Sequence, residues 1–296
     1  MKTAFIFPAF ITDYTEKEVD FLISNGININ TYIEKVSSIV ERDLHPFSYE
    51  SGFYKNDELL SQIIAYLFGC AISDSLRIKS IEPNYVSGYS MGIYAALYAA
   101  KSISIEEGVN LIVNAYKIVQ ELSKTGNYGM AAVIGLSIED IGQLINSNRL
   151  EVEIININNK HSIVVAGMKP DIKSFMNLAQ NEGAMSVAEL IVNTPYHSKY
   201  LLNYSGPFKD FIKSVNIQDA KTPIVSTHNQ KLCVSSEQIK EDLVHNLTEK
   251  INWFKTMQKL IEMDVNTFYE SGAGKDLTKI ARFIDGDYKI KSIYRI

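Results

Sequence analysis

Apolar residues follow two spacings along the chain, and these spacings predict alternating strands and helices. Residues 3–8 (TAFIFP) form a short continuous apolar run, which is typical of a strand buried on both faces. Within residues 56–78 the apolar positions recur at helical spacing. Residues 84–88 (NYVSG) predict a second short strand, and the Ala-rich segment after Gly92 predicts a helix that follows it directly. This alternation is typical of an α/β fold.

A long and well-buried helix is predicted after residue 104. Ser104 and Glu107 have the Ser-x-x-Glu spacing of a capping box, which marks the start of a helix. The apolar positions that follow form two adjacent rows on this helix: Ile105, Val109, Ile112, Tyr116 and Val119, and Leu111, Ala115, Ile118 and Leu122. A helix with so wide an apolar face is expected to lie deep in the core.

The pattern changes between residues 127 and 194, where it predicts a separate subdomain. The order there is strand, helix, strand, strand, helix, strand, which is the split βαβ pattern of ferredoxin-like folds. We therefore predict a ferredoxin-like subdomain at 127–194, inserted into a larger α/β domain made of residues 1–126 and 195–296. In the second part of that domain, TPIVSTHN predicts a strand, and NTFYESGAGKDLTKIARFI predicts a strand, a glycine turn and a helix.

The composition is that of a soluble globular protein and narrows the possible partners. Apolar residues make up 46% and charged residues 21% of the 296 positions, and the net charge is −5. Because no basic run offsets this charge, we expect neither nucleic acid nor a membrane as a partner. Pro8 interrupts the first apolar run, which is too short for a signal sequence, so a cytoplasmic protein is expected. Cys70 and Cys233 have no metal-ligand spacing, and we expect two buried thiols and no metal.

A serine between two glycines, Gly88-Tyr89-Ser90-Met91-Gly92, stands where the second strand turns into a helix. A residue at so sharp a bend is held in a strained conformation with its side chain projecting outward, and the flanking glycines permit the close packing. Ser90 is therefore predicted to be an exposed nucleophile. The N–H of Met91, at the start of the following helix, is predicted to form half of an oxyanion hole. The alternative is a tight turn in which Ser90 only caps the helix.

A serine nucleophile requires a base, and the chain has five histidines. His197, in VNTPYHSKYLL, lies where the chain leaves the subdomain, at the expected cleft between the two parts. His228, in STHN, is the competing candidate, whereas His45 and His161 are expected to be solvated bystanders. No carboxylate stands out as the third member of a triad. A dyad oriented by an amide or a carbonyl is an equally good arrangement.

Taken together, these segments resemble the malonyl-CoA:acyl carrier protein transacylase family, the acyltransferases of fatty acid and polyketide synthesis. That family begins with a strand and F-P-G-Q-G-S-Q, where this chain has FPAFITD, and its usual G-H-S-L-G elbow is GYSMG here. GMAAVIGLS, VEIININN, IVVAG, YHS, PIVSTHN, NLTEKINW and FYESGAGKDLTKI follow in the family's order and spacing. The resemblance implies an α/β-hydrolase-like core that carries a ferredoxin-like insertion.

The resemblance also implies roles for individual residues. Ser90 would accept the acyl group and His197 would be its base, with Asn246 orienting the histidine through its carbonyl. Met91 and Phe10 would supply the two oxyanion-hole N–H groups. The reaction implied is ping-pong acyl transfer between thioesters of coenzyme A and acyl carrier protein, with no cofactor besides these substrates.

One departure from the family bears on the substrate. The malonyl enzymes carry an arginine in a helix after the elbow, and it binds the free carboxylate of the substrate. The matching residue here is Ala115, and Lys117 is turned to another face of the helix. Because an unpaired buried carboxylate costs several kcal/mol, malonyl and methylmalonyl are expected to be poor substrates. The alternative is that an Arg or Lys from elsewhere reaches the same place.

Two further departures alter the walls of the site. The family's Gly-Gln-Gly is Ala9-Phe10-Ile11 here, so the first loop is either rebuilt or gives a weaker oxyanion donor, or Phe10 lines an acyl pocket. Tyr89 replaces the usual histidine before the serine. Together with Ala115 and Tyr196, Tyr89 is predicted to line the acyl pocket.

The sequence therefore predicts a serine-dependent acyltransferase that acts on acyl groups without a terminal carboxylate. Three alternatives remain open. The chain could be an acyl-thioester hydrolase that proofreads a polyketide assembly line, a malonyl transacylase with a relocated cation, or an inactive module that binds carrier proteins.

Overall fold

The computed structural model describes residues 1–9, 14–40, 44, 46–190 and 194–295. Phe10 and Ile11 of the predicted oxyanion loop and His45 lie outside these residues.

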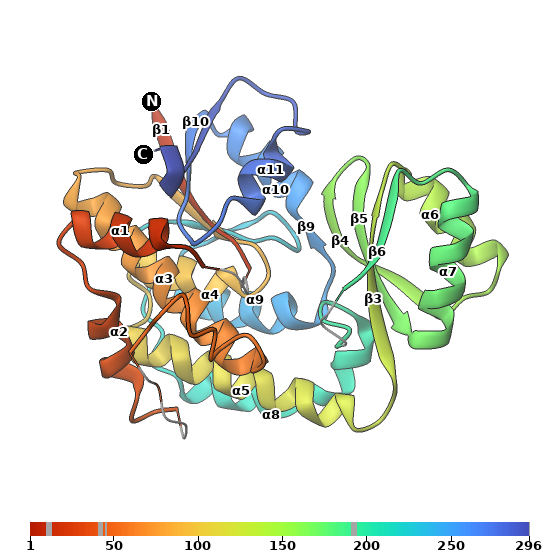
Figure 1. Ribbon diagram of the computed structural model, residues 1–296, viewed down its shortest axis with the longest axis horizontal. Coiled ribbons are helices and arrows are strands. Elements are labelled where there is room, and N and C mark those ends of the chain that lie inside the picture. Colours follow the sequence, from red (N-terminus) through yellow and green to blue (C-terminus); the bar gives the residue numbers. More distant parts are fainter. Residues whose placement is uncertain (10–13, 41–43, 45, 191–193, 296) are drawn as a thin grey trace.

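The larger part of the molecule is built on a mainly parallel sheet (Figure 1). The strand order is β11-β10-β1-β2-β7-β8; neighbouring strands are parallel except β7 and β8, which are antiparallel. The strands are β1 (Lys2–Phe7), β2 (Tyr85–Gly88), β7 (Ile224–Val225), β8 (Leu232–Cys233), β10 (Val265–Glu270) and β11 (Lys289–Ser292). β1 and β2, both predicted from apolar runs, lie side by side, and Phe7 pairs with Gly88 at their carboxyl ends. The serine elbow therefore begins at the edge of the sheet where α/β folds bind ligands.

Helices pack against this sheet and against one another (Figure 1). They are α1 (Glu16–Ser24), α2 (Ile29–Val36), α3 (Glu58–Ile78), α4 (Gly92–Ala99), α5 (Ile105–Ser123), α8 (Gly206–Ser214), α9 (Ser236–Thr248), α10 (Trp253–Glu262) and α11 (Asp276–Ala281), with short 3₁₀ segments η1 (Lys199–Tyr204) and η2 (Ile293–Arg295). The capping box predicted for α5 is present: Glu107 N donates to Ser104 Oγ over 3.1 Å, and Ser104 N donates to Glu107 Oε2 over 2.7 Å.

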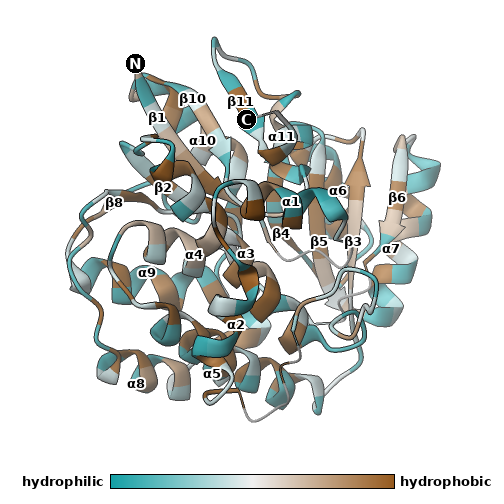
Figure 2. Ribbon diagram, turned by 60° about the vertical axis from the view of Figure 1, so that its left-hand side comes forward, coloured by the Kyte–Doolittle hydropathy of each residue, from teal (hydrophilic) through white to brown (hydrophobic). Residues whose placement is uncertain are grey.

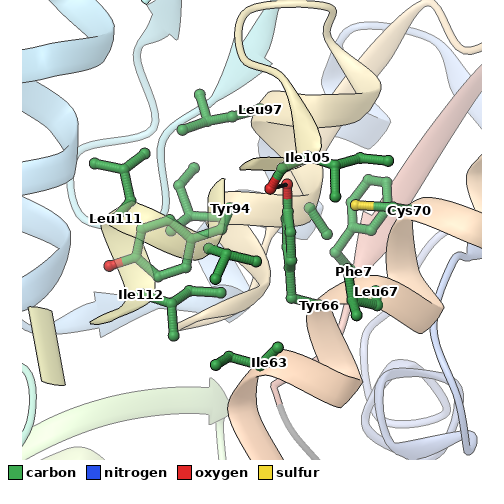
Figure 3. Packing of buried hydrophobic residues seen from close by; sticks show 14 of the residues in the cluster. Phe7, Ile63, Tyr66, Leu67, Cys70, Tyr94, Leu97, Ile105, Leu111 and Ile112 are labelled. Atoms are coloured by element: carbon green, nitrogen blue, oxygen red, sulfur yellow. Dashed lines mark hydrogen bonds between the residues drawn. The ribbon is translucent and has the colours of Figure 1, made fainter. Parts of the chain in front are cut away.

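Helices α3, α4 and α5 pack together beneath the elbow and form the centre of the main core. Figure 3 shows Tyr66 of α3 between side chains of β1 and α5, with Phe7 on one side and Ile112 on the other. Gly108 of α5 is required here, because a Cβ at this position would lie 2.0 Å from the hydroxyl of Tyr66. Among the described residues, α3 is the one helix long and apolar enough to cross a membrane, but 89% of its most apolar 18 residues are buried. Its apolar surface is thus used by the core.

The second sheet belongs to the region predicted as a subdomain. Its elements are β3 (Tyr128–Ile134), α6 (Ile138–Ser147), β4 (Val152–Asn159), β5 (Ser162–Met168), α7 (Lys169–Asn181) and β6 (Ser186–Glu189), in the predicted βαββαβ order. The strands are ordered β6-β3-β5-β4, as in ferredoxin-like folds, and α6 and α7 lie together on one face (Figure 1). Figure 2 shows hydrophobic residues along β3 and β5 and hydrophilic residues over much of α7, as expected for a sheet covered on one face by helices.

The second sheet also includes a strand from the larger part of the chain, which the sequence does not single out. β9 (Ile251–Asn252) lies outside the predicted range 127–194, yet it pairs in parallel with β4 at Asn156 and Ile157. The helix that follows it, α10, packs against both β4 and β10. Residues from both parts of the chain therefore meet at the junction where the site lies.

Candidate active site

Ser90 lies in a sharp turn between β2 and α4, as its flanking glycines indicate. Its φ of +56° is in the left-handed region, which a non-glycine residue rarely adopts. A Cβ at Gly88 would lie 2.2 Å from the backbone N of Ile93, and one at Gly92 would lie 2.3 Å from the carbonyl oxygen of Phe7. Both glycines are thus needed for the chain to turn this tightly against the end of β1.

Ser90 and His197 are in direct hydrogen-bond contact. Ser90 Oγ lies 2.7 Å from His197 Nε2, and His197 Nδ1 lies 2.5 Å from the backbone oxygen of Asn246. A carbonyl oxygen can only accept, so Nδ1 carries the proton and Nε2 has the lone pair that accepts from the serine hydroxyl. His197 is also in the left-handed region, with φ of +59°. The geometry is that of a serine–histidine dyad oriented by a main-chain carbonyl.

The histidine is held in its neutral form. His197 is 4% exposed, and this burial lowers the pKa of its imidazole to about 4, although the bond to Asn246 acts in the opposite direction. An imidazole that is neutral at physiological pH can take a proton from Ser90, as a general base must.

We expect the reactivity of Ser90 to follow this low pKa. Labelling of Ser90 by a sulfonyl fluoride, followed by intact mass, should keep its rate from pH 8 to about pH 5 and fall as the pH passes through about 4. The rate falls at low pH because His197 must be unprotonated to act as the base. Its pKa in the folded protein lies below the usual 6.5. Between these two values the unfolded chain binds more protons, so the free energy of unfolding should also decrease as the pH falls. A loss of labelling rate centred near pH 6.5 would contradict this assignment. So would a change in the pH profile when the exposed His161 is replaced by alanine.

Asn246 connects three parts of the site. Besides the bond from its backbone oxygen to His197, its side-chain Nδ2 donates to the backbone oxygen of Ser90 over 3.3 Å. Its Oδ1 accepts from Thr227 Oγ1 over 3.3 Å. Asn246, predicted to orient the histidine through a carbonyl, contacts it with its main-chain oxygen, and its side chain supports the serine turn.

His228, the competing candidate for the base, lies in a different cluster. Its Nδ1 is 2.9 Å from Ser226 Oγ and 3.1 Å from Asp242 Oδ1, and its ring stacks on that of His245 with centroids 5.0 Å apart. His228, His245 and Glu249 form the one group in the described part of the chain whose ligand atoms come within 4.8 Å of one another, as a metal site requires. None of them lines the cavity beside Ser90.

The backbone N–H of Met91 stands at the N-terminus of α4, where the helix dipole is positive. The hydrogen bonds of the turn use neighbouring groups: Gly92 N donates to Tyr89 O over 2.9 Å and Ile93 N donates to Ser90 O over 3.1 Å. No described residue accepts a hydrogen bond from Met91 N, so this donor is suited to an oxyanion. The second predicted donor, Phe10, lies outside the described residues.

A cavity of about 180 Å³ opens beside Ser90. We call it the Ser90 cavity; its lining is Ala9, Gln62, Tyr89, Ser90, Met91, Tyr94, Ala115, Tyr116, Met130, Asn156, Val164, Leu190, Tyr196, His197, Asn246 and Leu247. The three residues predicted to line an acyl pocket, Tyr89, Ala115 and Tyr196, are among them. Of the residues that the structure describes, no Asp, Glu, Lys or Arg lines it. Lys117 is exposed on the other side of α5, as predicted.

Sequence reasoning missed the polar residues that complete this lining. The hydroxyl of Tyr89 donates to Asn158 Oδ1 and accepts from Asn156 Nδ2, both over 2.7 Å. Its ring packs edge-on against Trp253, with centroids 5.6 Å apart. Burial raises the pKa of Tyr89 to about 12, so the phenol stays protonated and does not substitute for the base. The alternating polar residues of ININ were the one sequence signal for this contact, because alternate residues of a strand share a face.

Comparisons with known proteins agree with this geometry. A family model described as the acyl transferase domain matches residues 61–273. The malonyl CoA-acyl carrier protein transacylase of Staphylococcus aureus (strain MSSA476) is 31% identical over 219 residues, which are 73% of this chain and 71% of that protein.

Solved structures agree with the fold. The acyl-carrier-protein S-malonyltransferase from Burkholderia pseudomallei 1710b superposes with a TM-score of 0.91 at 23% identity, over 100% of this chain and 97% of that one. A malonyl-transacylase solved in complex with its type II PKS acyl-carrier protein gives a TM-score of 0.90 at 21% identity, over 99% and 96%. The predicted fold class, an α/β-hydrolase-like core with a ferredoxin-like subdomain, is confirmed.

Proposed function

This chain belongs to the acyl transferase domain family, among the malonyl CoA-acyl carrier protein transacylases, and on that premise we propose that it transfers acyl groups without a terminal carboxylate. The donor and acceptor are thioesters and thiols of coenzyme A or acyl carrier protein, and the intermediate is an ester on Ser90. The carrier-protein partner is supported by the names of the relatives, one of which was solved with its carrier protein.

The proposed reaction uses the dyad twice and requires no cofactor. Ser90 Oγ attacks the thioester carbonyl while His197 Nε2 takes the hydroxyl proton. The carbon–sulfur bond breaks, and the thiolate leaves with the proton from the imidazolium. An incoming thiol then gives its proton to His197 and attacks the carbonyl of the Ser90 ester. The bond between the carbonyl carbon and Ser90 Oγ breaks, and the imidazolium returns the proton to Oγ, which restores the hydroxyl. The Met91 N–H stabilises the oxyanion formed in each half-reaction.

The observation that carries the substrate assignment is the uncharged lining of the Ser90 cavity. Ala115 is 6% exposed and presents only a methyl group to the space that a substrate tail would enter. A terminal carboxylate placed there would lose its hydration without gaining a cationic partner from the described residues, which costs several kcal/mol. Neutral acyl groups do not incur this cost.

A labelling experiment tests this substrate assignment. The protein is incubated with acetyl- and malonyl-loaded carrier protein, and the ester on Ser90 is followed by intact mass. We expect acetyl to label Ser90 at least about 100-fold faster than malonyl, because several kcal/mol in the barrier correspond to two or more powers of ten. Preferential labelling by malonyl would refute the assignment and favour a cation supplied from elsewhere in the chain.

The fate of the same ester separates transfer from hydrolysis. An acyl-enzyme that persists in buffer and disappears when a thiol is added supports a transferase. Rapid release of free acid in the absence of thiol would instead identify an acyl-thioester hydrolase that uses the same dyad.

A further inference from the structure

One wall of the Ser90 cavity is backed by a carboxylate that does not itself line it. Tyr196 and Gln62 line the cavity, and both bond to Glu58 in the first turn of α3. The hydroxyl of Tyr196 donates to Glu58 Oε1 over 2.8 Å, and Gln62 Nε2 donates to the same oxygen over 3.1 Å. Gln62 Nε2 also lies 3.2 Å from the hydroxyl oxygen of Tyr196. Glu58 is thus one hydrogen bond away from the cavity.

The partners of Glu58 satisfy its oxygen without cancelling its charge. Tyr196 and Gln62 are both neutral donors, so the negative charge of the carboxylate is not paired within this cluster. Burial raises the pKa of Glu58, and the bonds from Tyr196 and Gln62 act in the opposite direction. In a partly buried site the field of such a charge is weakly screened, so it extends into the adjoining cavity.

The same bonds orient the amide of Gln62. Its Nε2 is used by Glu58 and Tyr196, and no described residue donates to its Oε1. Gln62 is 5% exposed, so this oxygen depends on the cavity for a donor. Tyr116, next to Ala115 on α5, lines the same cavity as Gln62 and Tyr196. The free acceptor of Gln62 and the charge of Glu58 therefore lie at the wall of a cavity that Ala115 and Tyr116 of α5 also line.

We propose that Glu58, Gln62 and Tyr196 form a subsite for acyl tails that end in a hydrogen-bond donor, a hydroxyl or an ammonium group. This inference rests on the proposed function and extends it. The acyl tail not only lacks a carboxylate but also ends in a group that donates a hydrogen bond. The donor bonds to Gln62 Oε1, and the charge of Glu58 behind the amide strengthens that bond and repels an anionic tail.

Coenzyme A thioesters matched in size test the subsite. Butyryl, 3-hydroxypropionyl and 3-aminopropionyl have the same number of heavy atoms and differ only in the terminal group; 3-methylbutyryl and malonyl form a second such pair. The rate of Ser90 labelling is measured for each under single-turnover conditions. We expect the two donor tails to exceed butyryl by about tenfold or more, with ammonium the faster, and 3-methylbutyryl to exceed malonyl by about 100-fold.

Variants show whether Glu58 is the cause. Glu58→Gln keeps the shape but removes the charge, and should reduce the ammonium-to-butyryl ratio about tenfold while raising the malonyl-to-3-methylbutyryl ratio about tenfold. Glu58→Asp keeps the charge and should retain the direction of both preferences. Glu121→Gln, an exposed acid on α5 bonded to Lys124, should change neither ratio.

The outcomes separate the two proposals. If Ser90 is labelled but donor tails have no advantage, or Glu58→Gln shifts all rates equally, the subsite is refuted and the acyl-enzyme stands. If no thioester labels Ser90, the proposed function fails and the subsite fails with it.

Discussion

Replacing Ser90 with alanine is expected to abolish the covalent acyl-enzyme and to lower thioester turnover by about 10⁴-fold or more. Among the described residues, the Ser90 hydroxyl is the one group to which His197 Nε2 is hydrogen-bonded, at 2.7 Å, so none of them offers another nucleophile at the base. Intact mass after incubation with acetyl-coenzyme A and a turnover assay with carrier protein measure the two effects. Residual turnover reflects only the binding and polarising groups that remain.

A control serine shows that the loss is specific to the elbow. Ser205→Ala removes a hydroxyl whose one partner in the described part of the chain is the backbone oxygen of Leu202, and this change should leave labelling and turnover unchanged. Circular dichroism of both variants checks that they fold. If Ser90→Ala kept full turnover, Ser90 would not be the nucleophile. If the wild-type protein bound carrier protein with no turnover at all, the chain would be a docking module instead of an enzyme.

Gly92→Ala is expected to lower the free energy of unfolding by about 3 kcal/mol or more and to remove activity with it. The new Cβ would lie 2.3 Å from the carbonyl oxygen of Phe7 and 2.6 Å from that of Pro8. These contacts are with backbone, which cannot move aside as a flexible side chain does, so β1 and α4 must separate. Separation would also displace Ser90 and Met91 from the end of the sheet. Urea denaturation gives the stability, and Ser90 labelling gives the activity.

Gly142 provides a matched control on α6. A Cβ at this position has no heavy atom within 4 Å, so Gly142→Ala should stabilise the protein by up to about 1 kcal/mol through its higher helix propensity. Labelling of Ser90 should not change. A Gly92→Ala variant as stable and as active as the Gly142→Ala variant would show that the elbow does not require close packing.

Local pattern was sufficient for the elements that frame the site. The apolar runs predicted β1 and β2, helical spacing predicted α3 and α5, and the capping box marked the start of α5. The order of strands and helices also indicated the ferredoxin-like subdomain. These features could be predicted because each depends on residues close together in sequence. By contrast, TPIVSTHN predicted a full strand, but only Ile224 and Val225 pair in β7, since pairing depends on a distant neighbour.

The amino-acid sequence by itself determined the elbow: glycines where no Cβ fits, and a serine between them. The tertiary structure decided the geometry of these groups and added partners that no pattern indicated. It placed His197, and not His228, at hydrogen-bond distance from Ser90, as the family resemblance implied, and set the main-chain carbonyl of Asn246 on that histidine. It also brought Glu58 to Tyr196 from 138 positions away. The physical reason is that hydrogen bonds and charges act through space over a few ångströms, whereas patterns in a sequence report only on neighbours along the chain.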